Sequence, residues 1–139
     1  MNDTGHWICE KFEPESFGFI YIITNLKNNR KYIGKKQLQF RKKRKLKHRK
    51  NSKISFSESD WKTYTGSCNE LNQDLEKYGK ENFKFEILKF CKNKWELAYE
   101  EIKLQIEKEV IKNSEYYNGI LNVRIAKPKL YWYKNADQG

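Results

Sequence analysis

Two short runs rich in β-branched and aromatic residues, each bounded by glycine, constrain this chain more than any other feature. The first run begins at Gly18 and reads Gly-Phe-Ile-Tyr-Ile-Ile-Thr, and the second reads Lys-Tyr-Ile-Gly-Lys-Lys and ends at Lys36. The polar, Asn-rich segment 25–29 between them is typical of a tight connection. Because alternate residues of a strand share a face, the pattern predicts a β-hairpin with Tyr21 and Tyr32 side by side.

Spacing alone does not show what these two tyrosines do. Strands favour tyrosine for packing reasons, so a Tyr-Ile-Gly run is by itself more typical of a core than of catalysis. Two phenols beside Lys35 and Lys36 nevertheless indicate a surface that binds something.

The charge balance favours a polyanionic partner. The chain has 29 lysines and arginines against 18 aspartates and glutamates, a formal net charge of +11, and we therefore expect it to bind nucleic acid. Its 139 residues suit one compact domain. We find no apolar run long enough to span a membrane and no signal-peptide pattern, and we expect a cytoplasmic protein without a membrane partner.

Cysteine usage predicts neither a disulfide framework nor a zinc finger. Cys9, Cys68 and Cys91 are odd in number and lie far apart, without a Cys-x-x-Cys pair. We expect all three to be reduced and structural.

The composition changes abruptly after residue 35. Between residues 41 and 50 the chain has no acidic residue and one apolar residue, Leu46. A solvated loop or a fraying helix is one interpretation, and a phosphate-binding arm is the one we favour, because surface charge runs usually alternate in sign. Such an arm would give affinity and salt dependence without sequence specificity. The residues predicted to bind nucleic acid are Lys35, Lys42, Lys43, Arg44, Lys45, Lys47, Arg49 and Lys50.

Three further elements follow the arm. Leu71, Leu75 and Tyr78 recur at helical spacing before Gly79, and alternating apolar residues predict a strand over 83–90. A longer helix is expected over 93–112. Its apolar stripe is predicted to contain Trp95, Ala98 or Tyr99, Ile102, Ile106 and Val110.

These elements predict an α+β fold in which a small three-stranded antiparallel sheet is flanked by helices. We expect an N-terminal extension over 1–16, a domain over 17–125 with a basic insertion at about 37–60, and a C-terminal tail over 126–139.

The triplets Phe19-Ile20-Tyr21 and Tyr32-Ile33-Gly34 resemble the signature of the GIY-YIG nuclease family, with Phe19 in place of the first glycine. The resemblance covers roughly residues 16–125. It implies hydrolysis of phosphodiester bonds in DNA with a divalent cation such as Mg²⁺ or Mn²⁺. The basic insertion and the run Tyr64-Thr65-Gly66-Ser67 look most like the small freestanding phage-type homing endonucleases of this family.

The resemblance also implies roles for the signature residues. Tyr21 would be the general base, Tyr32 would orient water or phosphate, and Gly34 completes the motif. The metal ligand would be a glutamate on the long helix, where only one of two adjacent side chains can face the hairpin. We choose Glu101 over Glu100.

Four more residues complete the implied site. Lys36, together with its neighbour Lys35, would supply the positive charge that a phenol with a pKa near 10 needs to act as a base. The family's phosphate-binding Arg lies on its first helix, at the position of Lys42, so we assign that role to Arg41. His48 is either an additional catalytic residue or part of the arm. Asn118 resembles the Asn that closes the domain in this family, after the helix that carries the metal ligand. Asn before Gly is, however, also common in turns.

The leading hypothesis is a metal-dependent DNA endonuclease of homing type, acting in a bacterial cell or a phage-infected host. It would be a monomer in solution, with a transient dimer on DNA or two successive nicks to break both strands. One alternative is a non-catalytic nucleic-acid-binding protein that uses the same arm and the aromatic residues 131–133. Another is a repair or restriction nuclease of the same fold.

Overall fold

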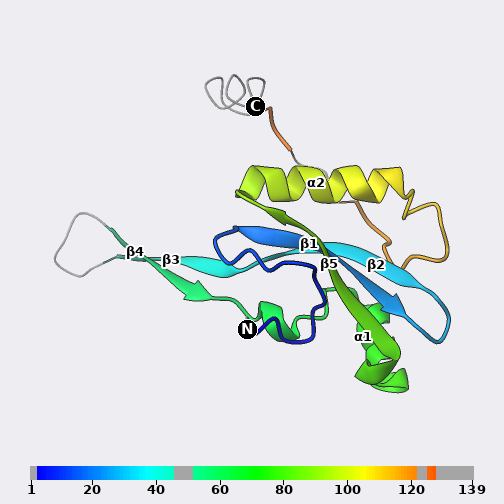
Figure 1. Ribbon diagram of the computed structural model, residues 1–139. Helices are drawn as coiled ribbons and strands as arrows, with labels where there is room; N and C mark the ends of the chain where they lie inside the picture. The colour runs from blue at the N-terminus through cyan, green and yellow to red at the C-terminus, as the bar shows by residue number, and fades with distance from the viewer. Residues whose placement is uncertain (1–2, 46–51, 122–124, 128–139) are drawn as a thin grey trace.

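The computed structural model describes residues 3–45, 52–121 and 125–127. Its centre is an antiparallel sheet in the order β2-β1-β5, with α2 across one face and α1 on the opposite side (Figure 1). The predicted α+β fold with a three-stranded sheet is therefore confirmed. The elements are β1 (Gly18–Asn25), β2 (Lys31–Gln37), β3 (Gln39–Lys45), β4 (Ser52–Glu58), η1 (Trp61–Thr63), α1 (Asn69–Tyr78), η2 (Lys80–Asn82), β5 (Phe83–Cys91) and α2 (Lys94–Glu107).

Strands β1 and β2 form the predicted hairpin. The register places Tyr21 opposite Gly34 and Ile23 opposite Tyr32, so the two tyrosines are diagonal neighbours on one face. In the connection, Asn29 adopts a positive φ of 63°, a conformation that Asn tolerates better than most residues.

Strand β5 pairs with the other edge of β1, and its register shifts between Ile20 and Tyr21. Ile20 lies opposite Lys89 and Tyr21 opposite Ile87, which leaves Leu88 as the extra residue of a β-bulge. A bulge bends the strand and re-aims neighbouring side chains. The irregularity therefore lies directly beside Tyr21.

Both faces of the sheet are covered. Phe19, Tyr21 and Ile23 point to the face that packs against Leu71 of α1 and against Trp61. The alternate residues of β1 point to the other face, where Ile20 packs with Leu97 of α2. Strand alternation thus divides β1 between two hydrophobic clusters.

Helix α2 differs from the prediction in where it ends and in which of its residues are buried. Its N-terminus is as predicted, because the Asn93 side chain accepts a hydrogen bond of 2.8 Å from the Glu96 amide. The helix ends at Glu107, before the predicted residue 112. Of the predicted stripe, Ile102 and Val110 are buried, Val110 beyond the end of the helix, but Tyr99 and Ile106 are exposed. Leu97 and Gln105 are buried instead, because a polar contact of Gln105, described below, sets the helix phase.

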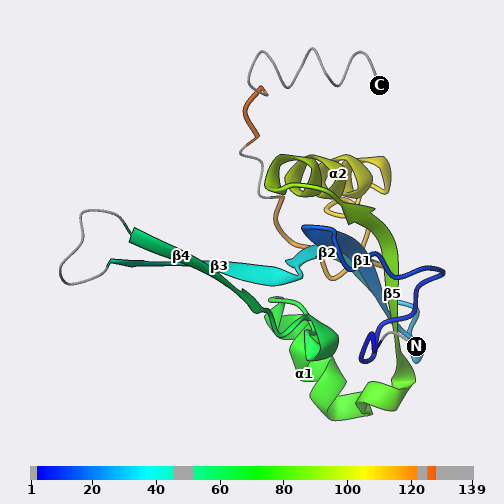
Figure 2. The ribbon, with the colours of Figure 1, turned by 60° about the vertical axis from the view of Figure 1, so that its left-hand side comes forward.

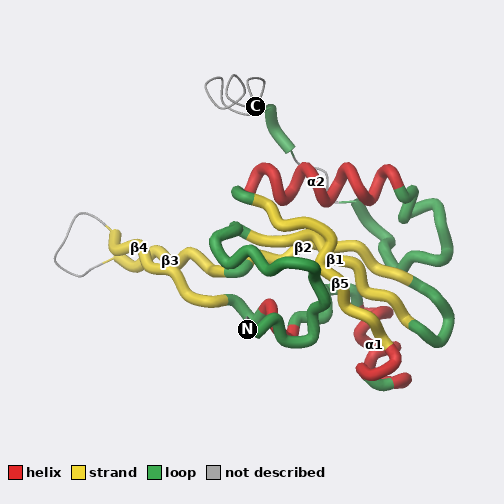
Figure 3. Tube along the Cα trace, in the orientation of Figure 1, coloured by secondary structure: helices red, strands yellow, loops and turns green. Residues whose placement is uncertain are grey.

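Residues 41–45 of the basic arm belong to strand β3, so the loop or helix considered from the sequence is wrong for these residues. Strand β3 pairs with β4 from Gln39 opposite Glu58 to Lys45 opposite Ser52. This β3–β4 ribbon projects sideways from the sheet (Figures 1 and 3). Ile54 and Phe56 alternate with polar residues, a strand period that was available in the sequence.

The N-terminal segment packs against the edge of β5. The Ile8 amide donates to the Phe85 carbonyl at 2.8 Å, and the Ile87 amide donates to the Ile8 carbonyl at 2.9 Å. Trp7 is 3% exposed and its ring contacts the rings of Phe19 and Tyr21. The predicted domain boundaries at 16/17 and 125/126 stay predictions. Within the described ranges, no helix combines the length and apolar character needed to cross a bilayer.

Replacing Trp7 by Ala should lower the free energy of unfolding by about 3 to 5 kcal/mol, because a buried aromatic side chain is lost and a cavity remains. Urea unfolding at equilibrium measures the change. The control is Ile8→Ala, whose side chain is 56% exposed while its backbone pairs with β5, and it should change stability by about 0.5 kcal/mol. Equal losses in both variants would contradict the placement of Trp7 in the core.

Candidate active site

A cavity of about 560 Å³ opens beside β2, the edge strand of the sheet. It collects side chains from both faces of the sheet and from the chain after α2. The lining residues are Tyr21, Tyr32, Lys35, Tyr64, Ser67, Cys68, Glu101, Gln105, Tyr117, Asn118, Gly119 and Ile120. Sequence reasoning singled out five of these for functional roles, namely Tyr21, Tyr32, Lys35, Glu101 and Asn118.

Tyr21 reaches the cavity from the central strand by crossing Gly34 on β2. A Cβ at position 34 would lie 2.5 Å from the Tyr21 hydroxyl and 2.7 Å from its Cζ. The Tyr21 and Tyr32 rings lie with their centroids 6.2 Å apart. Gly34 therefore provides space for the phenol, which is a physical reason for glycine in this motif.

The segment 64–67 closes over the two phenols from the other side. The Tyr64 ring lies 6.2 Å from that of Tyr21, centroid to centroid. Gly66 has a positive φ of 84°, and a Cβ there would lie 3.2 Å from both Tyr21 and Tyr32. From the sequence, the run 64–67 served only as a mark of family resemblance, although a Tyr-Thr-Gly-Ser turn after an aromatic segment was a usable signal.

The phenols are held in their neutral form in the free protein. Burial raises the pKa of Tyr21 well above its ordinary value, and the neighbouring Tyr32 and Tyr64 act in the same direction. Burial also raises the pKa of Tyr32, while a hydrogen bond with Ser67 opposes the shift. Tyr21 thus does not have the lowered pKa that a base in the free protein would need.

The two lysines predicted to activate a phenol have other partners. The Lys36 amine lies 2.7 Å from Asp60 and 3.9 Å from the centre of the Tyr64 ring. The Lys35 amine lies 3.7 Å from the Glu101 carboxylate, and its side chain is 43% exposed. Lys35, rather than Lys36, therefore lines the cavity.

Glu101 faces the cavity and its neighbour Glu100 does not line it. The Glu101 side chain is 13% exposed and contacts Lys35, whereas Glu100 pairs with Lys89 of β5 at 3.1 Å. Burial raises the pKa of Glu101 above the ordinary range, and Lys35 partly opposes this. The helix phase chosen from the sequence agrees with this geometry.

The donor set fits a hard divalent cation bound mostly by water and substrate. Glu101 supplies one carboxylate to the cavity wall, and the described residues contain no group of three or more His, Cys, Asp or Glu side chains. Mg²⁺ retains several waters and is commonly held by one or two carboxylates together with substrate phosphates. Glu101 alone would thus be sufficient as the protein ligand.

Asn118 and Gln105 hold the middle residue of the Tyr32-Ile33-Gly34 motif. The Ile33 amide donates to Asn118 Oδ1 at 3.0 Å, and the Ile33 carbonyl accepts from Asn118 Nδ2 at 2.8 Å and from Gln105 Nε2 at 2.9 Å. All these groups are buried. Sequence reasoning selected Asn118 but missed Gln105, because a polar residue on an apolar stripe gives no sign of its partner.

The remaining predicted residues lie on the ribbon or outside the described residues. Arg41 and Lys42 are on strand β3, so the helix that the resemblance implies for the phosphate-binding Arg is not formed at this position. Lys43, Arg44 and Lys45 lie on the same strand. His48, Lys47, Arg49 and Lys50 lie outside the described residues.

The fold and the cavity together define a small α+β domain in which two hairpin tyrosines and one helical glutamate meet. The family model described as "Putative endonuclease segE, GIY-YIG domain" matches residues 5–121. The chain therefore belongs to the GIY-YIG domain family.

One curated relative is the "Putative endonuclease segE" of Enterobacteria phage T4. It is 33% identical over 102 residues, which are 73% of this chain and 40% of the relative. The matched region thus spans less than half of that relative's length. No solved structure matches the chain.

Replacing Gly34 by Ala should destabilise the protein by about 1 to 3 kcal/mol, because the new methyl group would overlap the buried Tyr21 ring. The matched control is Gly119→Ala, which also lines the cavity but has no atom within 4 Å of its added Cβ. Urea unfolding of both variants checks this. Equal stability of the two variants would show that Tyr21 does not cross β2 at Gly34.

Proposed function

We propose that this chain is a DNA endonuclease that hydrolyses phosphodiester bonds with the help of a divalent cation, Mg²⁺ or Mn²⁺. The observation that carries the proposal is the meeting of Tyr21, Tyr32 and Glu101 in one cavity beside β2. A core alone would not require a half-buried phenol and a carboxylate in one cavity. Membership of a family described as an endonuclease domain supports the same activity.

Glu101 would hold the cation at the cavity wall. When bound, the cation would offset charge on the phosphoryl oxygens and lower the pKa of the water that it holds. The burial of Glu101, which raises its pKa, makes an opposite charge more favourable beside the ionised carboxylate. In the free protein the Lys35 amine occupies this role at 3.7 Å.

The tyrosines would position the reacting groups. A neutral phenol can donate a hydrogen bond to a phosphoryl oxygen or accept one from the attacking water. Tyr32 is less buried than Tyr21 and would touch the scissile phosphate or its water. Tyr21 would act as the base only in the substrate complex, since its pKa in the free protein is raised.

Lys35 would contribute the phosphate-binding cation that the family places on a helix. Its amine is already at the cavity, and a phosphate beside Glu101 would lie within reach of the same group. Lys36 would act indirectly, because its amine fixes Tyr64 and Asp60. Asn118 would position Tyr32 and Gly34 through the backbone of Ile33.

Double-stranded DNA is the substrate we propose, on the basis of the +11 net charge and the endonuclease description of the family. A relative from a bacteriophage supports a homing type of action in the cytoplasm of an infected bacterial cell. With one cavity of this kind proposed for catalysis, a monomer would nick. Breaking both strands would need two nicks or a transient dimer.

Replacing Glu101 by Gln should reduce nicking of supercoiled DNA in Mg²⁺ by at least about 10²-fold, because the carboxylate charge at the cavity is lost. The matched control is Glu100→Gln, the adjacent glutamate that pairs with Lys89, and it should nick at close to the parent rate. Conversion of supercoiled to open circular plasmid, followed on agarose gels, measures the rates.

Chelation by EDTA should stop the reaction, and Mn²⁺ should restore it. The proposal fails if the parent chain binds plasmid but nicks none in Mg²⁺ or Mn²⁺, which would favour the non-catalytic binding protein. The assignment of Glu101 as the metal ligand fails if Glu100→Gln is inactive and Glu101→Gln is active.

A further inference from the structure

We propose that the β3–β4 ribbon binds the backbone of duplex DNA with one of its two faces, the face that carries the even-numbered positions of β3. This inference rests on the proposed function, since it supplies the duplex that the cavity would cut. It also divides the four predicted cations that lie on β3 into Lys42 and Arg44 on this face and Lys43 and Lys45 on the opposite face, which would not hold the duplex.

The register of the ribbon separates its residues into two sets. Residues directly opposite one another in an antiparallel pair share a face, and successive positions alternate. The even face carries the pairs Phe40–Ser57, Lys42–Ser55 and Arg44–Lys53. The odd face carries the pairs Gln39–Glu58, Arg41–Phe56, Lys43–Ile54 and Lys45–Ser52. Each set has three cations, but only the odd set contains an acidic residue, Glu58, and an aliphatic residue, Ile54.

The even face continues into the cavity. The Lys36 amine lies 5.1 Å from the centre of the Phe40 ring and 3.9 Å from the centre of the Tyr64 ring. Tyr64 in turn lines the cavity beside Tyr21 and Tyr32. A continuous surface therefore leads from the even face, past the Lys36 amine and its partner Asp60, to the phenols.

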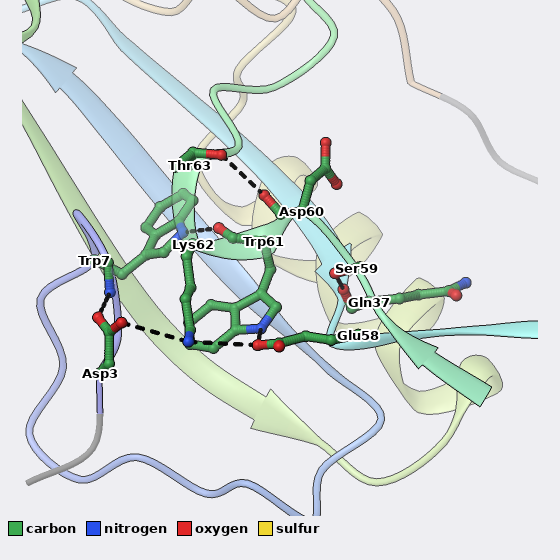
Figure 4. Close-up of polar contacts among 10 residues, drawn as sticks. Asp3, Trp7, Gln37, Glu58, Ser59, Asp60, Trp61, Lys62 and Thr63 are labelled. Carbon is green, nitrogen blue, oxygen red and sulfur yellow. Dashed lines mark hydrogen bonds and ion pairs between the residues drawn. The ribbon is translucent and has the colours of Figure 1, made fainter.

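The odd face continues into a different part of the molecule. Gln39 and Glu58 line a second pocket together with Asp3 and Phe12 of the N-terminal segment. Lys62 lies between two carboxylates there, 3.5 Å from Asp3 and 3.6 Å from Glu58 (Figure 4). The carboxylates make this side less favourable for a phosphate backbone than the even face.

The root of the ribbon is anchored to the sheet. Ser59 donates from its hydroxyl to the Gln37 carbonyl at 2.6 Å (Figure 4). Its amide donates to the Leu38 carbonyl at 2.9 Å. Trp61 is 3% exposed and donates from its indole to Glu58 at 3.1 Å. These contacts fix the direction in which the ribbon leaves the domain (Figure 2).

The dimensions suit a duplex. Seven residues of strand extend about 23 Å, which corresponds to roughly seven base pairs along the helix axis. A groove about 12 Å wide admits a two-stranded ribbon, and the right-handed twist of a ribbon lets it follow a curved groove. The even face would thus hold the duplex while the cavity receives a phosphate near the root of the ribbon.

The test compares two double variants of equal charge change, made only of lysine-to-glutamine substitutions. Lys42→Gln with Lys53→Gln alters the even face, and Lys43→Gln with Lys45→Gln alters the odd face. Binding of the full chain to a fluorescent 30-base-pair duplex is measured by anisotropy in EDTA at several salt concentrations. Circular dichroism and urea unfolding verify that both variants fold like the parent.

The even-face variant should bind about tenfold more weakly, and its plot of log binding constant against log salt should be shallower by about 1.8, because two phosphate contacts are lost. The odd-face variant should change this slope by less than half as much. Equal slopes for the two variants, a larger loss in the odd-face variant, or no loss in either would overturn the proposal.

Failure of the ribbon proposal and failure of the proposed function are distinguishable. Nicking by the parent chain in Mg²⁺ tests the enzyme without reference to the ribbon, whereas the slopes in EDTA test the ribbon without cleavage. A single-stranded probe of the same length and label is measured in parallel. Equal even-face losses on both probes would show that the ribbon does not select a duplex, and would also overturn the proposal.

Discussion

The arrangement of the site depends on how the exposed edge of β2 is covered. An edge strand leaves backbone amides and carbonyls that need partners when buried. Here two side-chain amides, from Gln105 and Asn118, satisfy both polar groups of Ile33. Gln105 lies one helical turn after Glu101, and residues four apart share a helix face. The hydrogen bond that covers the edge strand therefore also turns Glu101 toward the cavity.

On the other face of the sheet, the absence of a side chain at Gly34 lets Tyr21 reach the cavity. Tyr21 belongs to the central strand and is 1% exposed, so its hydroxyl reaches the edge only across a position without a side chain. Tyr21 is consequently both a core residue and a residue of the cavity. The two interpretations of the tyrosines, packing and chemistry, are not alternatives in this fold.

The elements that depend on local periodicity could be predicted from the sequence. The features that depend on a partner elsewhere in the chain could not. The hairpin, the third strand and the long helix follow from alternation, turn composition and the helical spacing of apolar residues. The ribbon does not follow from β3 itself, since five consecutive cations have no strand period, and it forms because β4 offers the alternating partner. The contacts of Gln105 with Ile33 and of Tyr64 with Tyr21 were not predicted, because these partners lie far away in the chain.

The position of the cations also separates this chain from the family pattern that its motif resembles. That pattern places an arginine on a helix after the signature glycine, but here the corresponding residues continue as a strand that leads away from the sheet. The cation at the cavity is Lys35, on β2 itself and directly after Gly34. A flexible ammonium group can exchange Glu101 for a phosphate without moving the backbone. Under the proposed function, phosphate binding would thus be divided between two places, the Lys35 amine at the cavity and the cations of the β3–β4 ribbon.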